Sequence, residues 1–294
     1  MNPRFDIIVP TFNRRNELPE FFRRNEALNK KDVVVWLVDD CSVERIDDVL
    51  PTWPNLRYIR LTRNQGQTFA RNVAIEQATA PYIVSLDDDA WFEDASPALD
   101  ELERLFQVHP EAGCVMFNIA TPHSQYSARP TGTRIPLHVT CGCAFRRSGL
   151  LQAGGFSDFL HSQAEETDLS IRIYRLGMSI IFAREVKVFH NFSPGNRPVK
   201  WYFYNRHNTT RNDLLIVVMY YPLHWVIPYL VGKFMSHLRF AVSYGVAVAG
   251  TIWYTWKALF SFFGLLPEAI RRRRPMTKQQ FKDWRSLLNS SYPL

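Results

Sequence analysis

The first half of the chain alternates short apolar runs with segments of helical spacing. Four apolar runs are typical of strands, at residues 5–10, 33–38, 57–61 and 82–86. Between them, residues 15–28 and 66–78 have the composition and spacing of helices. Short strands that alternate with helices predict an α/β fold with a mostly parallel central sheet, flanked by helices. Ligands of such sheets bind at the carboxyl ends of the strands.

The second half has a more mixed pattern. Strands are expected at residues 112–119, 137–145, 179–183 and 186–190. Helices are expected at residues 147–153 and 165–176. No internal repeat or long linker separates these segments from the first half, so residues 1–212 are predicted to form one domain.

The character of the chain changes after residue 212. Residues 214–232 and 240–256 contain no Asp, Glu, Lys or Arg over 19 and 17 positions, close to the roughly 20 residues of a membrane span. Lys233 and Arg239 in the connection disfavour a hairpin that crosses the bilayer. We expect helices that lie in one leaflet, which makes residues 213–294 a membrane-association region. A buried helical subdomain and a two-helix membrane hairpin are the alternatives.

Composition and charge agree with this division. The chain is 46% hydrophobic and 21% charged, which excludes a disordered protein. Its net charge is +7, but residues 257–294 alone carry eight basic and two acidic side chains. The nearly neutral remainder argues against a nucleic-acid partner, and the basic tail favours an anionic membrane surface. The four cysteines are expected to be reduced, in a cytosolic compartment.

Three consecutive carboxylates follow the apolar run at residues 82–86. Asp87, Asp88 and Asp89 repel one another at a strand end unless a positive group lies beside them. A divalent cation with oxygen ligands, which also binds substrate phosphates, suits this arrangement. A solvated acidic turn that caps the next helix is the alternative interpretation.

Other polar residues follow the neighbouring strands. Thr11 follows the first strand, and Asp39 and Asp40 follow the second. Gly66 permits a close approach of the backbone, and Arg71 on the next helix supplies a cation for an anion or for one of the aspartates.

In order and spacing these motifs resemble those of family 2 glycosyltransferases. The resemblance rests on residues 9–14, 38–42, 64–66, 70–72, 87–89, 142–147, 154–156 and 165–169. It covers roughly residues 5–212 and implies the GT-A fold, a Rossmann-like α/β fold. It also implies an inverting reaction that uses a nucleotide-sugar donor.

The resemblance implies a donor site at the strand ends. Thr11 and Asp40, with Asp39 beside it, are expected to bind the nucleoside, Arg71 to close that pocket, and Gly142 to leave room for the sugar ring. The full set of expected nucleotide and donor contacts is Pro10, Thr11, Asn13, Arg14, Asp39, Asp40, Gly66, Arg71, Asp87, Asp88 and Gly142.

A divalent cation, Mn²⁺ or Mg²⁺, is the cofactor that the resemblance implies. Asp89 is the first expected ligand, with Asp87 beside it and His190 completing the site from a later strand. The catalytic base of the family is usually the aspartate of a Glu-Asp pair. Here Glu166 occupies that position, and Glu165 or Asp168 are the alternative bases.

Trp201, Arg206 and Arg211 lie in a stretch that resembles one in bacterial polysaccharide rhamnosyl- and galactosyltransferases, which implies acceptor contacts. The predicted function is transfer of a sugar from a UDP- or dTDP-sugar to a hydroxyl of a polyprenyl-pyrophosphate-linked glycan in cell-surface polysaccharide synthesis. The enzyme is expected to bind the cytoplasmic face of the membrane peripherally, through lipid contacts. Alternatives are an inactive nucleotide- or glycan-binding protein of the same fold and a nucleotidyltransferase.

Overall fold

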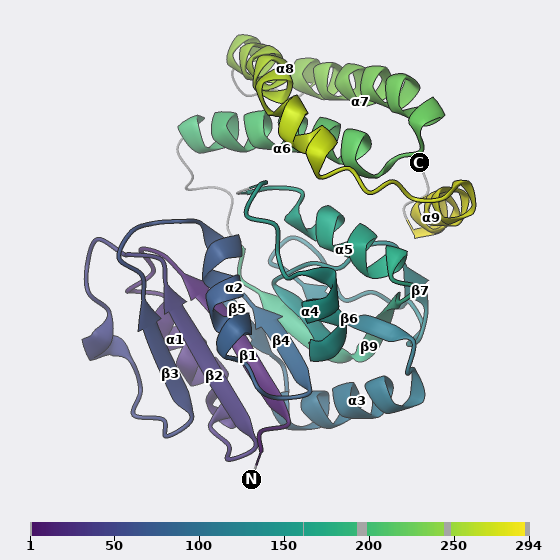
Figure 1. Ribbon diagram of the computed structural model, residues 1–294. Helices are drawn as coiled ribbons and strands as arrows, with labels where there is room; N and C mark the ends of the chain where they lie inside the picture. The colour runs from purple at the N-terminus through teal and green to yellow at the C-terminus, as the bar shows by residue number, and fades with distance from the viewer. Residues whose placement is uncertain (1, 161, 193–198, 244–247, 292–294) are drawn as a thin grey trace. The chain divides into compact units, whose positions relative to one another are not determined.

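The chain divides into two compact units in a computed structural model (Figure 1), which describes residues 2–160, 162–192, 199–243 and 248–291. The first unit comprises Met1–His161 and Arg172–Ser193, and the second comprises Ser162–Ile171 and Pro194–Leu294. The predicted boundary after residue 212 lies inside a helix of the second unit. The assignment of catalysis to residues 1–212 and of membrane association to residues 213–294 stays a prediction.

One sheet forms the centre of the first unit. Within the described residues its strands are β1 (Phe5–Thr11), β2 (Val33–Asp39), β3 (Leu56–Arg60), β4 (Tyr82–Leu86), β5 (Ala90–Phe92), β6 (Ala112–Ala120), β7 (Arg134–Ile135), β8 (Gly142–Arg146) and β9 (Ser179–His190). Their order is β3-β2-β1-β4-β8-β6-β9-β5, and β7 pairs with β9 outside this path.

The strands of the first half pair as the sequence predicts. β3, β2, β1 and β4 are parallel neighbours. Helix α2 (Gln67–Gln77) packs on β1 and β2. β1 and β4 are buried along almost their whole length, as expected for parallel strands covered on both faces. The parallel order brings the carboxyl ends of β1, β2 and β4 to one edge.

The second half of the sheet corrects the prediction of a mostly parallel sheet. β8 is antiparallel to β4 and to β6, and β5 and β7 are antiparallel to β9, whereas β6 and β9 are parallel. No α-helix lies between β6 and β8 in this fully described part of the chain. The crossover that parallel neighbours need is therefore missing there.

Strand lengths also differ from the prediction in this half. The expected strand at residues 137–145 is restricted to β8, and the two expected strands at residues 179–190 form the single strand β9. The pairing of β9 with β6 shifts register between Phe117 and Asn118. This irregularity lies where the sequence predicts a break between two strands.

Further helices of the first unit are α1 (Leu18–Arg24), α3 (Ala95–Val108) and α4 (Arg147–Ala153). The division between the two units falls inside α5 (Glu165–Arg175), whose residues up to Ile171 belong to the second unit. The helix expected at residues 15–28 is reduced to α1 and a short 3₁₀ turn. Asp94 caps α3 by accepting a hydrogen bond from the backbone N–H of Ser96.

The second unit is helical, with α6 (Val199–Tyr220), α7 (Leu223–Ser243), α8 (Val248–Arg271) and α9 (Lys278–Ser291). α6 packs against both α7 and α8. Phe203 stacks on Tyr254, with ring centroids 4.9 Å apart. The Arg273 guanidinium donates to the carbonyls of Val218 and Tyr221, which satisfies acceptors that the carboxyl end of α6 leaves unpaired.

The two apolar segments do not coincide with single helices. Within residues 214–232, α6 ends at Tyr220 and α7 begins at Leu223, because Pro222 cannot donate a helical hydrogen bond and restricts the residue before it. Residues 240–256 include the end of α7, residues outside the described part, and the start of α8. Among the described residues, no helix combines the length and hydropathy that a membrane span requires.

Candidate active site

Sheet register gathers the predicted carboxylates at one edge. Thr11 at the end of β1 pairs with Asp39 at the end of β2, and β4 runs parallel on the other side of β1. Asp87, Asp88 and Asp89 follow β4 directly. This edge is the place where parallel sheets bind ligands.

Asp88 is the buried member of the carboxylate series. It is 7% exposed, and its Oδ2 accepts a hydrogen bond of 2.6 Å from the Thr11 hydroxyl. Burial, with the charge of Asp89, raises the pKa of Asp88 to about 7, although Thr11 and Arg14 oppose this shift. Asp88 therefore holds two strand ends together, rather than lying open to a ligand.

Asp89 pairs with a histidine from the far end of the sheet. Antiparallel pairing of β5 with β9 places His190 opposite Ala90, so His190 lies beside Asp89. The His190 Nε2 atom is 3.1 Å from Asp89 Oδ1 and 3.9 Å from Asp87 Oδ2. The predicted metal ligands Asp87, Asp89 and His190 thus lie together.

The charges in this group stabilise one another. Burial opposes ionisation of Asp89, but the hydrogen bond and charge of His190, with the charge of Arg14, lower the pKa of Asp89. Burial also disfavours protonated His190, yet the hydrogen bond to Asp89 and the neighbouring carboxylates raise the pKa of His190. The Arg14 Nη2 atom lies 3.3 Å from Asp89 Oδ2.

Asp87 is held by Arg71, so one of the aspartates is a partner of this cation, as expected from the sequence. The side chain of Arg71 has no exposed surface, and its Nη2 donates to Asp87 Oδ1 at 2.5 Å. Its Nε donates to Ser85, whose hydroxyl donates to the Thr140 carbonyl. Arg71 therefore lies behind Asp87, and its closing of the nucleotide pocket stays a prediction.

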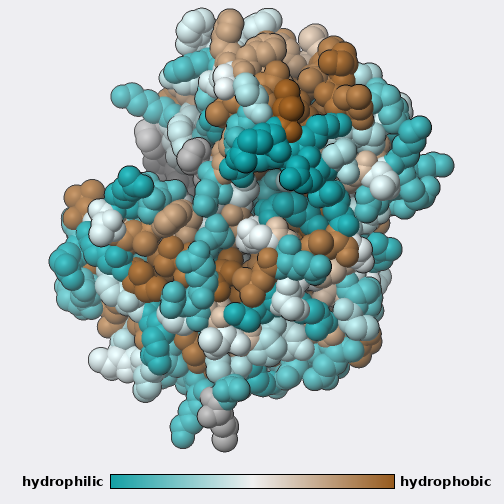
Figure 2. Space-filling model, viewed as in Figure 1, coloured by the Kyte–Doolittle hydropathy of each residue, from teal (hydrophilic) through white to brown (hydrophobic). Residues whose placement is uncertain are grey.

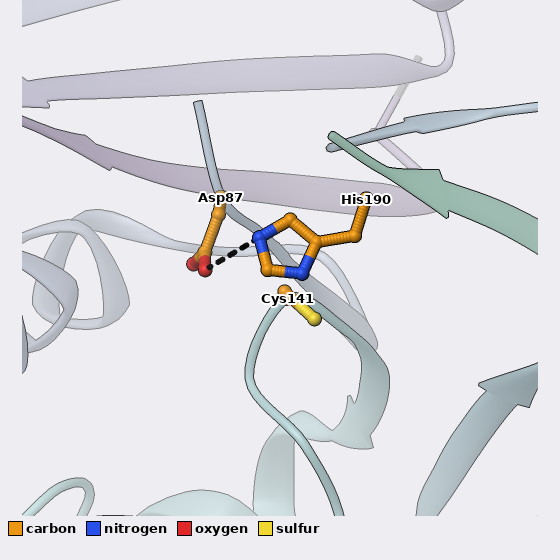
Figure 3. Close-up of side chains that lie close together, drawn as sticks. All are labelled: Asp87, Cys141 and His190. Atoms are coloured by element: carbon orange, nitrogen blue, oxygen red, sulfur yellow. Dashed lines mark ion pairs between the residues drawn. The ribbon is translucent and has the colours of Figure 1, made fainter. Parts of the chain in front are cut away.

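The donor set at this edge fits a divalent cation. Ligand atoms of Asp87, Cys141 and His190 all lie within 4.8 Å of one another (Figure 3), and Asp89 adds a carboxylate beside His190. Carboxylate oxygens, imidazole nitrogen and a thiol are all established ligands of divalent metals. The sequence does not indicate Cys141 as a ligand, because Cys141 and Cys143 lack the second pair of a typical metal motif and Asp87 is far away along the chain.

The side chains of Asp39 and Asp40 both interact with other groups of the protein. Asp40 accepts hydrogen bonds of 2.7 Å from the backbone N–H groups of Gln65 and Gly66, and burial raises the pKa of Asp40. Gly66 has a φ of 91°, which favours glycine. Asp39 has no exposed side-chain surface and forms an ion pair of 2.7 Å with Arg60.

Other predicted donor contacts have structural partners too. Asn13 has a φ of 56° and accepts a hydrogen bond from the Val43 N–H, and Pro10 is half-buried within β1. A Cβ on Gly142 would lie 2.9 Å from the Ile119 side chain. The small residue at position 142 is therefore required by packing, and its expected role of leaving room for the sugar ring stays a prediction.

The three candidate bases differ in accessibility within the second unit. Glu165 and Asp168 are 4% and 1% exposed, and Asp168 accepts a hydrogen bond of 2.6 Å from the Tyr220 hydroxyl. Glu166 is partly exposed on the first turn of α5. Among the three, Glu166 is the carboxylate that a solvent-borne acceptor can reach.

The expected acceptor residues all lie on α6. Trp201 is half-buried and packs edge-on against Tyr202. Arg206 donates to Thr210 and contacts His237 on α7, and Arg211 donates to the Asn212 side chain at 2.9 Å. Burial lowers the pKa of both arginines.

The raised pKa of Asp88 predicts a pH-dependent stability that Asp88→Asn removes. Between the unfolded pKa of about 4 and the folded pKa of about 7, the folded chain retains a proton that the unfolded chain has lost. The contribution of Asp88 to wild-type stability therefore falls as pH rises through this window, by up to about 1.4 kcal/mol per pH unit. We measure the urea concentration at the midpoint of unfolding, with a chelator present to remove metal ions. The midpoint of Asp88→Asn minus that of wild type should increase as pH rises from 4 to 7.

Glu20→Gln is the control for this measurement. Arg23 and Arg24 lower the pKa of Glu20 to about 2, so its contribution is present above the unfolded pKa and is lost only as pH falls below about 4. Its difference from wild type should stay constant between pH 5 and 8. A difference between Asp88→Asn and wild type that is equally constant would contradict the assignment.

Two family models match the chain. The model of glycosyl transferase family 2 matches residues 6–150, and that of glycosyl transferase family group 2 matches residues 111–267, which is more than half of the chain. An uncharacterized glycosyltransferase of Haemophilus influenzae is 29% identical over 180 residues, covering 57% of this chain and 60% of that protein.

A second curated relative is the putative teichuronic acid biosynthesis glycosyltransferase TuaG of Bacillus subtilis. It is 27% identical over 117 residues, covering 38% of this chain and 44% of that protein. The chain thus spans less than two thirds of the length of either relative.

Solved structures share the fold. S. aureus TarS 1–349 in complex with UDP-GlcNAc has a TM-score of 0.61 at 17% identity, covering 99% of this chain and 89% of that chain. The mannosyltransferase PcManGT from Pyrobaculum calidifontis, in complex with GDP-Man and Mn²⁺, has a TM-score of 0.58 at 16% identity, covering 99% and 86%. The match of both family models and the common fold confirm the resemblance found in the motifs, and the chain belongs to the family 2 glycosyltransferases.

Proposed function

We propose that this protein is a metal-dependent, inverting glycosyltransferase that uses a UDP- or dTDP-sugar to extend a glycan in cell-surface polysaccharide synthesis. The observation that carries the proposal is the convergence of Asp87, Asp89 and His190 at the carboxyl edge of the sheet. The relatives support it, since TarS was solved with UDP-GlcNAc, PcManGT with GDP-Man and Mn²⁺, and TuaG is named for teichuronic acid biosynthesis.

Asp87, Asp89 and His190 would hold the divalent cation. When bound, that cation neutralises charge on the departing diphosphate. The chain prepares for this role with fixed charges: Arg71 orients the Asp87 carboxylate, and the low pKa of Asp89 keeps that side chain ionised. Because these groups are already in place, little reorganisation is needed when the donor binds.

The nucleoside is proposed to bind beside the loop that Asp40 holds. Asp40 fixes the turn at Gln65 and Gly66. Phe12, directly after the buried Thr11, is 43% exposed and offers an aromatic face on which a base can stack. Phe12 does not stand out in the sequence, because one aromatic residue after a strand is more often part of a core.

Glu166 is the proposed general base. Its carboxylate takes the proton of the acceptor hydroxyl while the hydroxyl oxygen attacks the anomeric carbon, and the bond to the nucleoside diphosphate breaks on the opposite face. The configuration at that carbon is therefore inverted. The burial of Glu165 and Asp168 supports this choice over the two alternatives.

The acceptor is proposed to be a polyprenyl-pyrophosphate-linked glycan that binds along α6, at Trp201, Arg206 and Arg211. Both guanidiniums are partly buried, where an anion gains more from a fixed cation than it does in water. Trp201 offers an aromatic surface for a sugar ring.

We further propose that the helical unit binds the cytoplasmic face of the membrane as a peripheral protein. Apolar side chains repeat every fourth position on α7 and every third or fourth on α8, which aligns them along each helix. We call these residues the apolar stripes: Leu223, Ile227, Val231 and Met235 on α7, and Trp253, Trp256, Phe260 and Phe263 on α8.

The apolar stripes are exposed, and a basic segment follows them in the chain. Leu223 is 78% exposed, and Phe260 is 71% exposed. Figure 2 shows hydrophobic surface over this part of the helical unit. Residues 271–274 are four consecutive arginines, the first of which ends α8. Apolar stripes beside a basic cluster suit an anionic bilayer surface.

Calorimetric binding of UDP, dTDP and GDP, each with and without Mn²⁺, tests the donor site. We expect one nucleotide to bind only with Mn²⁺, and Asp89→Ala to weaken that binding at least about tenfold, because it removes a carboxylate from the cation site. Asp100→Ala, at a carboxylate that is 69% exposed on α3, is the control and should bind like wild type. Metal-independent binding, or no binding of any of the three, would contradict the proposal.

Flotation with lipid vesicles tests membrane association. Wild type should float with phosphatidylcholine vesicles that contain phosphatidylglycerol, and less so without the anionic lipid. Phe260→Asp should weaken binding at least about tenfold, since one large apolar side chain contributes about 1.5–3 kcal/mol when it leaves water. Val108→Asp, at a residue 58% exposed on α3, is the matched control, and equal losses in both variants would contradict the proposed surface.

A further inference from the structure

The register of the sheet places the thiol of Cys141 in the candidate metal site. Antiparallel pairing of β4 with β8 places Leu86 opposite Gly142, so the next residue on one side, Asp87, meets the preceding residue on the other, Cys141. The Cys141 Sγ atom lies within 4.8 Å of ligand atoms of both Asp87 and His190. Figure 3 shows the three side chains together, from three separate segments.

The burial of Cys141 and the groups beside its sulfur favour binding of an ion. It is 4% exposed, and its sulfur lies beside groups that differ in chemical character, a carboxylate and an imidazole. A set of one oxygen, one nitrogen and one sulfur donor is softer than the all-oxygen set that Mg²⁺ prefers. The third donor therefore changes which cation the site selects.

We propose that Cys141 is a sulfur ligand of the divalent cation, and that the site consequently binds thiophilic ions such as Zn²⁺, Co²⁺ and Cd²⁺ more tightly than Mg²⁺. On binding, the thiol releases its proton to solvent and the sulfur forms the bond to the ion. The inference rests on the proposed donor site but adds a ligand and a selectivity to it.

Cys143, on β8, offers a matched control. It is fully buried and pairs with Ser85 inside the sheet, two residues from Cys141. A serine at either position changes one sulfur atom to oxygen at nearly constant size. The two variants therefore differ mainly in whether the altered atom belongs to the Asp87, Cys141 and His190 cluster.

The test is titration of the full chain with Co²⁺. Binding is monitored by the absorption band of thiolate-to-cobalt charge transfer. Wild type and Cys143→Ser should show the band, and Cys141→Ser should lose it. By calorimetry, Cys141→Ser should bind Zn²⁺ at least about tenfold more weakly than wild type. A loss of metal affinity of about tenfold or more is typical even for a residue that only hydrogen-bonds a metal ligand. Mg²⁺ affinity should stay within about twofold of wild type.

A band that persists in Cys141→Ser, that is absent from wild type, or that is lost equally in Cys143→Ser would overturn the inference. The outcome is separable from that of the donor site. Mn²⁺-dependent nucleotide binding without the cobalt band refutes the sulfur ligand alone, whereas the band without nucleotide binding refutes the proposed function alone.

Discussion

Three adjacent carboxylates at the end of a buried strand are the constraint on which the site depends. Asp87, Asp88 and Asp89 follow β4, and three such charges in partly buried surroundings cannot remain uncompensated. The protein compensates each one differently. Arg71 pairs with Asp87, burial raises the pKa of Asp88 to about 7, and His190 pairs with Asp89. The result is a site in which Asp87 and Asp89 are held at fixed positions by Arg71 and His190.

The change from parallel to antiparallel pairing assembles this site. The parallel strands β1, β2 and β4 bring the predicted carboxylates to one edge, as in any sheet of this kind. The antiparallel pairs then add residues from the distant part of the chain: β8 brings Cys141 to Asp87, and β9 brings His190 to Asp89. A uniformly parallel sheet would not place these four side chains together in this way.

The sequence predicted the features that depend on local pattern. The strands and helices of residues 5–86 follow from periodicity, and the motifs around Asp40 and Asp87 predicted which edge carries the site. It predicted that Arg71 meets an anion or one of the aspartates but not which of these, because an arginine on a helix gives no local signal of which side it faces. Cys141 could not be found either, since its approach to Asp87 depends on the register of β4 and β8.

The most direct test of the account is proton NMR of a panel of UDP-, dTDP- and GDP-sugars incubated with the protein, Mn²⁺ and polyprenyl-linked glycans. The account predicts that one donor is consumed, that the new glycosidic bond has the opposite anomeric configuration, and that Glu166→Gln slows the reaction at least about 100-fold through loss of the base. Retained configuration, an unchanged rate in Glu166→Gln, or consumption of no donor would contradict it.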